Sequence, residues 1–340
     1  MRKALASLFT MLLILGTIQA QDSGYKVLDK VKLGGEGGWD YLNADPVSGR
    51  LYISRGTHVQ VMDMDSKKLV GDIPNTNGVH GIALATDLGK GFVSDGRDTA
   101  VTVFDIKSLT TLKKIKIEGL NPDAIMYDPF SQRVFTFNGR SSNATAIDAL
   151  GDTVVGTVPL DGKPEFAQND GKGNIFVNIE DKNEITQFDS KTLKVVRSWP
   201  IAPGEEASGL AIDLEHHLLF SVCSNKLMAI SDYEAGKVVG TVAIGEGPDA
   251  AGYDPELHYA FSSNGEGTLT VVKVDGPDKF TVIDSVKTQP RARTMSLDPK
   301  SHRIYLSTAE FGATPEKTAE NPRPRSPMVK DSFTIIILGK

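Results

Sequence analysis

Cysteine is nearly absent from this chain of 340 residues, since Cys223 is the only one. A single thiol excludes an internal disulfide, and it also excludes covalent haem attachment through a Cys-x-x-Cys-His site. Basic side chains are too few for a nucleic-acid-binding surface, because 37 Lys and Arg stand against 43 Asp and Glu, for a net charge of −6. Binding to phosphate backbones needs clustered Lys and Arg, so we expect no nucleic-acid partner.

Apolar runs long enough to span a bilayer are missing beyond residue 20. The one apolar run, Ala4 to Ile18, follows Met1-Arg2-Lys3 and precedes Gln19-Ala20, which is the pattern of a secretory signal peptide. We therefore predict cleavage near Ala20, a location in the periplasm or outside the cell, and no membrane span after cleavage. Residues 1–20 are then the signal peptide, and residues 21–340 form a single domain.

Motifs that position a nucleophile or a phosphate group are missing as well. The sequence contains no Gly-x-Ser-x-Gly, no His-Glu-x-x-His and no glycine loop that opens a helix to hold phosphate. The sequence therefore favours a binding protein over an enzyme and leaves the second possibility open.

What the sequence contains instead is one unit repeated seven times. Its clearest copy, residues 122–138, consists of a polar residue, a short apolar strand, an Asp-Pro turn and a second apolar strand. We call the polar residue of each copy its anchor. The anchors recur every 40 to 44 residues, at Asp40, His80, Asp123, Glu165, Ser208, Asp249 and Arg293. Asp stands five residues after the anchor in six of the seven copies, and four of these have Pro next, as tight turns require.

Each unit continues with two more segments in which apolar residues alternate with polar ones, so a unit has four strands in about 40 residues. Four strands in about 40 residues are typical of a β-propeller blade. A lone strand at residues 25–33 precedes the first anchor, and the last unit ends after three strands. We predict an all-β, WD40-like, seven-bladed propeller whose N-terminal strand completes the C-terminal blade and so removes exposed sheet edges.

Three segments carry a family resemblance: Leu51-Tyr52-Ile53-Ser54, Gly91-Phe92-Val93-Ser94 and Ile175-Phe176-Val177-Asn178. They resemble the YVTN repeat, and residues 25–340 as a whole resemble the YncE-like family of exported seven-bladed propellers. More distantly, the chain is similar to propeller lactonases and to the haem d1 domain of nitrite reductase. The resemblance implies fold and export, and it assigns no chemistry because the shared motif consists of packing and turn residues.

The anchors are the candidate ligand-binding site, because residues that begin innermost strands ring one mouth of the propeller channel, where we expect a funnel. Two interpretations stay open: the charged anchors pair with one another at a wet channel mouth, or they bind a ligand there. Asp does not recur at the anchor position as it does at the turn, which favours a site. Oxygen and nitrogen donors for a divalent metal cofactor come from Asp40, His80, Asp123, Glu165 and Asp249.

We expect a monomeric, non-catalytic binding or scaffold module that holds a small molecule, a peptide or a protein partner at this funnel. The alternative is a metal-dependent, lactonase-like hydrolase in which the same acidic funnel holds the ion. A third hypothesis is a propeller that carries haem or a quinone, with His80 as the only anchor imidazole available to haem iron.

Blade seven departs from the repeat at residues 309–330, which replace the usual short turn with a loop rich in proline. Loops this long are typically functional or disordered, and the prolines stiffen this one. We predict a lid that brings Arg323 and Arg325 to the carboxylates of the funnel, the alternative being a solvated loop without a role. His216, His258 and His302 precede second strands at the opposite face, where we expect them to face solvent.

Overall fold

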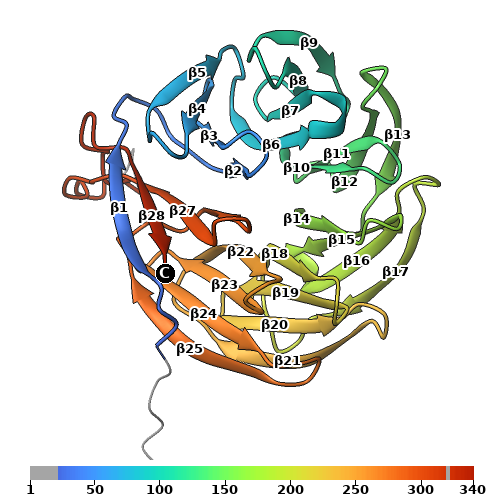
Figure 1. Cartoon of the computed structure of the whole chain (residues 1–340). Helices are drawn as coiled ribbons and strands as arrows, with labels where there is room; N and C mark the ends of the chain where they lie inside the picture. Colours follow the sequence, from blue (N-terminus) through green and yellow to red (C-terminus); the bar gives the residue numbers. More distant parts are fainter. Residues whose placement is uncertain (1–21, 319–321) are drawn as a thin grey trace, which may run out of the picture.

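The computed structural model of the chain describes residues 22–318 and 322–340. The predicted signal peptide at residues 1–20 lies outside these ranges. Within them, seven four-stranded antiparallel sheets surround a central channel (Figure 1). This confirms the predicted all-β, seven-bladed propeller. None of the described helices is long and apolar enough to cross a membrane.

The blades follow one another along the chain, each with its strands in order from the channel outward. The first three blades contain β2 (Leu42–Asp45), β3 (Arg50–Ser54), β4 (Val59–Asp63), β5 (Leu69–Ile73); β6 (Val79–Ala85), β7 (Lys90–Asp95), β8 (Ala100–Asp105), β9 (Thr111–Lys116); and β10 (Pro122–Asp128), β11 (Arg133–Asn138), β12 (Asn143–Asp148), β13 (Thr153–Pro159). The next three contain β14 (Pro164–Asn169), β15 (Asn174–Ile179), β16 (Glu184–Asp189), β17 (Val195–Pro200); β18 (Ala207–Asp213), β19 (Leu218–Cys223), β20 (Leu227–Asp232), β21 (Lys237–Ala243); and β22 (Pro248–Asp254), β23 (Tyr259–Asn264), β24 (Thr268–Val274), β25 (Phe280–Lys287). Blade seven contains β26 (Met295–Asp298), β27 (Arg303–Thr308), β28 (Thr334–Gly339) and β1 (Lys26–Lys32), and two short 3-10 turns occur at η1 (Thr86–Leu88) and η2 (Glu180–Lys182).

The Asp residue of the repeat closes the turn between the first and second strands. The Asp128 carboxylate is buried and accepts hydrogen bonds from the backbone N–H and the hydroxyl of Ser131, at 3.1 and 2.6 Å. Asp45 does the same for the N–H of Val47 at 2.9 Å and the hydroxyl of Ser48 at 2.6 Å. Each carboxylate satisfies polar groups of a reversing backbone, which explains why Asp recurs at this position.

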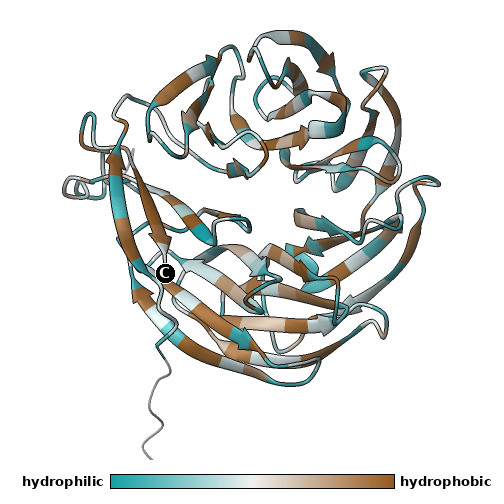
Figure 2. Ribbon diagram, viewed as in Figure 1, coloured by the Kyte–Doolittle hydropathy of each residue, from teal (hydrophilic) through white to brown (hydrophobic). Residues whose placement is uncertain are grey.

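The core lies between neighbouring blades, where apolar side chains of adjacent sheets pack against each other. Apolar residues recur along the strands of every blade (Figure 2). One aromatic residue of each second strand is at most 1% exposed, namely Tyr52, Phe92, Phe135, Phe176, Phe220, Phe261 and Tyr305. Burying one such side chain stabilises the fold by about 2–3 kcal/mol. The repeated aromatic position therefore marks the packing between blades.

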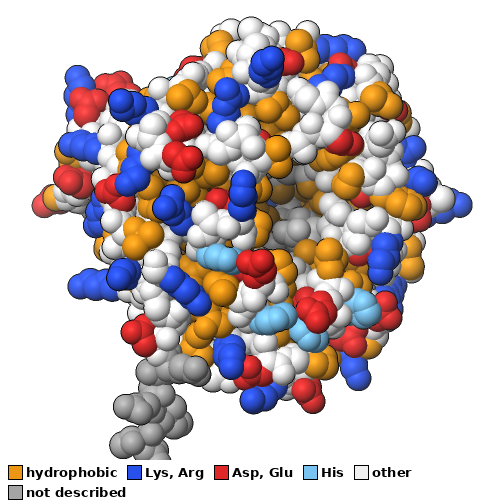
Figure 3. Space-filling view, in the orientation of Figure 1, with side chains coloured by type: hydrophobic (Ala, Val, Ile, Leu, Met, Phe, Trp, Pro, Cys, Tyr) orange, Lys and Arg blue, Asp and Glu red, His pale blue; other side chains and the backbone are white. Residues whose placement is uncertain are grey.

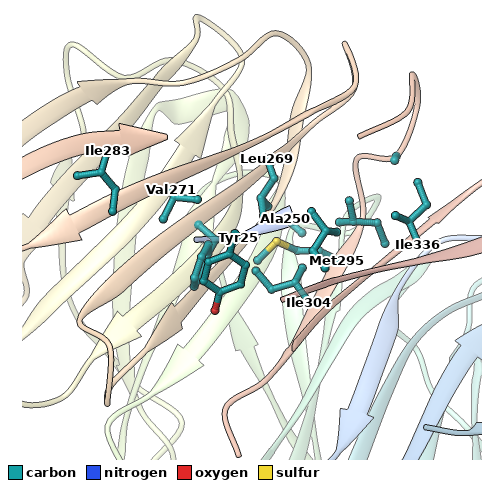
Figure 4. Packing of buried hydrophobic residues seen from close by; sticks show 12 residues of the cluster. Tyr25, Ala250, Leu269, Val271, Ile283, Met295, Ile304 and Ile336 are labelled. Carbon is teal, nitrogen blue, oxygen red and sulfur yellow. The ribbon is translucent and has the colours of Figure 1, made fainter. Parts of the chain in front are cut away.

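The ring closes through β1, the outermost strand of blade seven, as predicted. It pairs antiparallel with β28, from Lys26 opposite Gly339 to Lys32 opposite Thr334. Just before β1, the buried ring of Tyr25 packs among residues of blades six and seven, including Phe261, with the ring centroids 5.1 Å apart (Figure 4). The Tyr25 hydroxyl donates a hydrogen bond to the His302 carbonyl at 2.9 Å. Both ends of the described chain thus hold one blade together.

Candidate functional site

Five anchors occupy the second position of an innermost strand, where regular pairing is interrupted. The register shifts immediately after the first residue in β6, β10, β14, β18 and β22. Such bulges redirect side chains out of the regular alternation of a strand. The remaining anchors, Asp40 and Arg293, each stand two residues before their innermost strand.

Polar residues near the end of three second strands, β7, β15 and β23, bind the anchor backbone of the next blade. The Ser94 hydroxyl donates to the Asp123 carbonyl at 2.5 Å, and the Asn178 amide donates to the Ser208 carbonyl at 3.0 Å. The Ser263 hydroxyl donates in the same way to the Arg293 carbonyl. Ser94 and Asn178 are the last residues of the YVTN-like segments, so the repeat motif positions the anchors.

Six of the seven anchors line one cavity of about 400 Å³ at the channel mouth, which we call the funnel. These six are Asp40, Asp123, Glu165, Ser208, Asp249 and Arg293, and the wall also includes Lys163, Glu180 and Glu206. His80 does not line the cavity itself. Its Nδ1 lies 2.7 Å from Oδ2 of Asp40 and 3.6 Å from Oδ1 of Asp123, so it contacts two residues that do.

In the Asp40–His80–Asp123 group, one imidazole lies between two carboxylates. Burial lowers the pKa of His80, but the hydrogen bond to Asp40 and the charges of Asp123, Asp40 and Glu165 outweigh burial and raise it. Burial raises the pKa of Asp123 to about 6, helped by Asp40 and opposed by His80. The two carboxylates therefore favour the protonated form of the imidazole, while burial favours the protonated form of Asp123.

The other side of the funnel is acidic too. Lys163 Nζ lies 2.7 Å from Oε1 of Glu165 and also contacts Glu180. Burial nevertheless raises the pKa of Glu165 to about 7, since the charge of Asp123 adds to it and Lys163 only partly offsets it. Burial also raises the pKa of Asp249, although Arg293 Nη1 lies 3.1 Å from its carboxylate. The hydroxyl of Ser208 donates to the Asp249 carbonyl at 2.9 Å, so this anchor supports the backbone.

Two aromatic rings form the floor of the funnel. Tyr41 of blade one and Phe166 of blade four meet with ring centroids 4.6 Å apart. Both residues line the funnel and also a second cavity of about 490 Å³ below it, which contains Asn43, Gln168 and Asn169. The pair therefore separates the channel into an upper and a lower compartment. Burial, with the carboxylates above, raises the pKa of Tyr41 and keeps its hydroxyl protonated.

The loop of blade seven forms an arm beside the funnel. A bridge between Phe311 and Met328 closes its base, and it leaves the ring between β27 and β28 (Figure 1). Together with Trp39 and Arg291, the arm encloses a groove of about 840 Å³. Asp40, Gly247, Arg293 and Thr294 line both this groove and the funnel, so the two spaces adjoin.

The groove combines aromatic rings with cations. The Arg291 guanidinium stacks over the Phe311 ring at 3.9 Å and donates to the Ser326 hydroxyl at 3.1 Å. Trp39 lies between Phe311 and Phe333, with centroid distances of 6.1 and 5.2 Å. Such a surface suits apolar or anionic groups.

The two arginines of the predicted lid lie in the arm at different places. Arg325 lines the groove, and Arg323 is exposed and lines neither space. Within residues 22–318 and 322–340, neither forms an ion pair with a funnel carboxylate. The arm thus stands beside the funnel, and its role as a lid stays a prediction.

Sequence reasoning missed the floor of the funnel, although a signal was present. The residue after the anchor is Gly81, Ala124, Gly209, Ala250 or Thr294 in five blades, and it is Tyr41 or Phe166 in the other two. Aromatic residues at an otherwise small position indicate a special contact. The repeat pattern also gives no reason to separate Trp39 from the packing residues or Lys163 from the solvated lysines.

The donors proposed for a metal divide into two groups. Asp40, His80 and Asp123 each offer one ligand atom within 4.8 Å of the other two. Glu165 and Asp249 do not belong to this set and pair instead with Lys163 and Arg293. His80 Nδ1 already contacts both aspartates, so a metal held by all three residues would compete with these contacts.

Of the comparisons with known proteins, the one with solved structures finds matches, and these concern the fold. No family model matches the sequence. No curated protein matches it either. Among solved structures, 1813 chains match, which shows how widespread the architecture is. One of them, from the structure titled "Crystal Structure of Mitotic Checkpoint Complex", has a TM-score of 0.74 at 13% identity over 97% of this chain and 99% of that chain. At this identity the likeness shows the seven-bladed propeller alone.

Proposed function

We propose that the chain is an exported, YncE-like binding module that captures a positively charged ligand in the funnel without chemically changing it. The observation that carries the proposal is the excess of acid in the wall. Lys163 and Arg293 are the cations among the funnel-lining residues, and they face six carboxylates: Asp40, Asp123, Glu165, Glu180, Glu206 and Asp249. Burial is the main cause of the raised pKa values of Asp123 and Glu165, about 6 and about 7, and the neighbouring carboxylates Asp40 and Asp123 add to these shifts.

An organic ammonium group is the ligand charge that this wall suits best. The adjoining groove would hold the rest of the ligand, since Trp39 and Phe311 offer apolar surface and Arg291 and Arg325 attract a carboxylate. A short peptide with a free amino terminus can offer an ammonium group followed by an apolar part and a carboxylate. The amino-terminal end of a protein can offer the same groups. Periplasmic or secreted location belongs to the same proposal and rests on residues 1–20.

The proposal predicts how affinity depends on pH. Asp123 and Glu165 gain protons as the pH falls through about 7 to about 6, and each proton removes a negative charge from the wall. Affinity for an ammonium group should therefore be highest above pH 7 and should fall below it. Binding near pH 6.5 should release protons into the buffer, because a bound cation favours the ionised carboxylates.

Calorimetric titration with a tripeptide of Phe, Ala and Glu, compared with its N-acetylated form, tests the proposal at pH 7.5. We expect the free amine to bind and acetylation to remove binding. Asp123→Asn should weaken binding, whereas Asp278→Asn, an exposed acid on an outer turn, should leave it unchanged. Equal affinity for both peptide forms, or no effect of Asp123→Asn, would contradict the proposal.

A second candidate function, metal-dependent hydrolysis of the lactonase kind, is favoured by the Asp40–His80–Asp123 donor set. These residues would hold a divalent ion, which would polarise a substrate carbonyl. Metal analysis of the purified protein and of Asp123→Asn, with a γ-lactone hydrolysis assay, separates this candidate from the first. One bound ion that is lost in the variant together with hydrolysis would favour the enzyme.

A further inference from the structure

A second cluster of potential metal ligands lies at the opposite end of the blades. Each innermost strand runs from its anchor to the turn that leads into the second strand, so these turns lie away from the funnel. Glu215 and His216 belong to the turn between β18 and β19, and His258 belongs to the turn between β22 and β23. One ligand atom of each lies within 4.8 Å of the other two. Figure 3 shows histidine side chains beside acidic ones near the central hollow.

Buried Asp213 organises this cluster. Its Oδ1 accepts the backbone N–H groups of Glu215 and His216 at 2.9 and 3.3 Å, which fixes the turn. Its Oδ2 lies 2.7 Å from Nδ1 of His216. Because the buried carboxylate accepts there, Nδ1 carries the hydrogen and Nε2 keeps its lone pair. A carboxylate behind an imidazole is the usual support of a metal-binding histidine.

Tyr253 lies beside the second histidine. Burial, together with an interaction with Asp213, raises the pKa of the Tyr253 hydroxyl, which therefore stays protonated. Nδ1 of His258 lies 3.4 Å from the tyrosine oxygen. Because this contact involves Nδ1, Nε2 of His258 remains for a metal, as it does in His216.

We propose that Glu215, His216 and His258 bind a zinc ion, with water in the fourth position. Two neutral imidazole nitrogens and one carboxylate oxygen are a ligand set that Zn²⁺ accepts, and three protein ligands leave one position exchangeable. The turns come from neighbouring blades and are held by the closed ring, so the site is rigid before metal arrives. It is separate from the funnel and does not depend on the proposed function.

Neighbouring histidines on this face supply internal controls. His302 Nδ1 lies 2.7 Å from Asp254, and its Nε2 lies 3.1 Å from Glu256, so both ring nitrogens already have carboxylate partners. His217 points to a different place, with its ring packed against Tyr233 at a centroid distance of 5.4 Å. Neither belongs to the three-residue cluster.

The test is Zn²⁺ binding by the full chain without residues 1–20, stripped with EDTA and titrated at pH 7.5 against a chromogenic chelator. We expect one equivalent to bind, and we expect His216→Ala and His258→Ala to weaken binding at least about tenfold. Asp213→Asn should weaken it about 10–100-fold, as loss of a support behind a ligand does. His217→Ala and His302→Ala should bind as the parent does. Far-UV circular dichroism confirms that each variant is folded.

Cobalt provides a second readout, since Co²⁺ in a four-coordinate site gives visible absorption that His258→Ala should abolish. Absence of Zn²⁺ binding by the parent would overturn the proposal. So would binding that survives His258→Ala and is lost in Asp123→Asn, because the ion would then occupy the funnel.

Discussion

The rings of Tyr41 and Phe166 meet inside the channel, 4.6 Å apart, although 125 positions separate the two residues in the sequence. Blades one and four supply them, and between them they divide the channel into two compartments. The carboxylates above this floor are consequently kept from water on one side, which contributes to the raised pKa of Glu165.

Phe166→Ala should remove the floor and admit water beneath the funnel. We expect the pKa of Glu165 to fall from about 7 toward its usual range, because burial is the main cause of its shift. The free energy of unfolding should fall by about 2 kcal/mol. Carboxyl titration followed by NMR measures the pKa, and Phe130→Ala on the exposed surface is the control. An unchanged titration would show that the floor does not determine the electrostatics of the funnel.

Glu165→Gln should stabilise the fold at alkaline pH. A carboxyl whose pKa rises from 4.5 to about 7 on folding destabilises the fold by about 3 kcal/mol above pH 7. The interaction with Lys163 is already contained in that pKa, so we expect a gain of about 1–3 kcal/mol at pH 8. The gain should shrink as the pH falls through 7 and should vanish below about 4, where the carboxyl is protonated in both states.

Urea unfolding at pH 8 and pH 5 measures this difference, with Glu246→Gln as the matched control. Glu246 is exposed and pairs with Lys226, so its replacement should not stabilise the fold at either pH. A Glu165→Gln variant that is less stable than the parent at pH 8 would contradict the argument.

Replacing residues 312–329 with a short turn should remove one side of the groove and leave the funnel intact, which distinguishes their contributions to ligand binding. We expect the tripeptide with a free amine to bind more weakly, since the groove loses Thr314, Arg325 and Ser326. A simple alkylamine should bind as before, because none of the described residues of the arm lines the funnel. Calorimetry with both ligands measures the difference. Equal loss for both would mean that the arm also covers the funnel, as the lid hypothesis states.

Tyr25→Ala should weaken the closure of the ring. The side chain is 4% exposed and packs between blades six and seven, so its removal should cost about 3 kcal/mol. Lys26→Ala, at the next and exposed position, should cost little. Thermal and urea unfolding measure both. A Tyr25→Ala variant as stable as the parent would show that this end of the chain does not help to hold blade seven.

The fold was predictable from the sequence because its determinants repeat. Equivalent residues have the same role in successive blades, as shown by the turn carboxylates Asp45 and Asp128 and the buried aromatics Tyr52 and Phe135. The seven copies of the unit therefore support one interpretation. Spacing also placed six anchors on one cavity wall, since strand order alone decides which end of a blade they occupy.

Contacts across the channel or between turns were not predictable in the same way. That Tyr41 meets Phe166, and that His216 meets His258, depends on the diameter of the ring and on side-chain directions, which no repeat length specifies. The arm shows the same limit. Its sequence predicts a stiff loop on the funnel face, whereas its position beside the funnel depends on the packing of Phe311 with Trp39 and Arg291.

The pairing of β1 with β28 also has a consequence for how the protein folds. Among the described residues, these two strands are far apart in sequence and yet adjacent in one sheet. Contacts between distant segments form slowly, because the loop between them must first be closed. The seam between β1 and β28 should therefore be a late step in folding, after the six blades that are each made from one continuous segment.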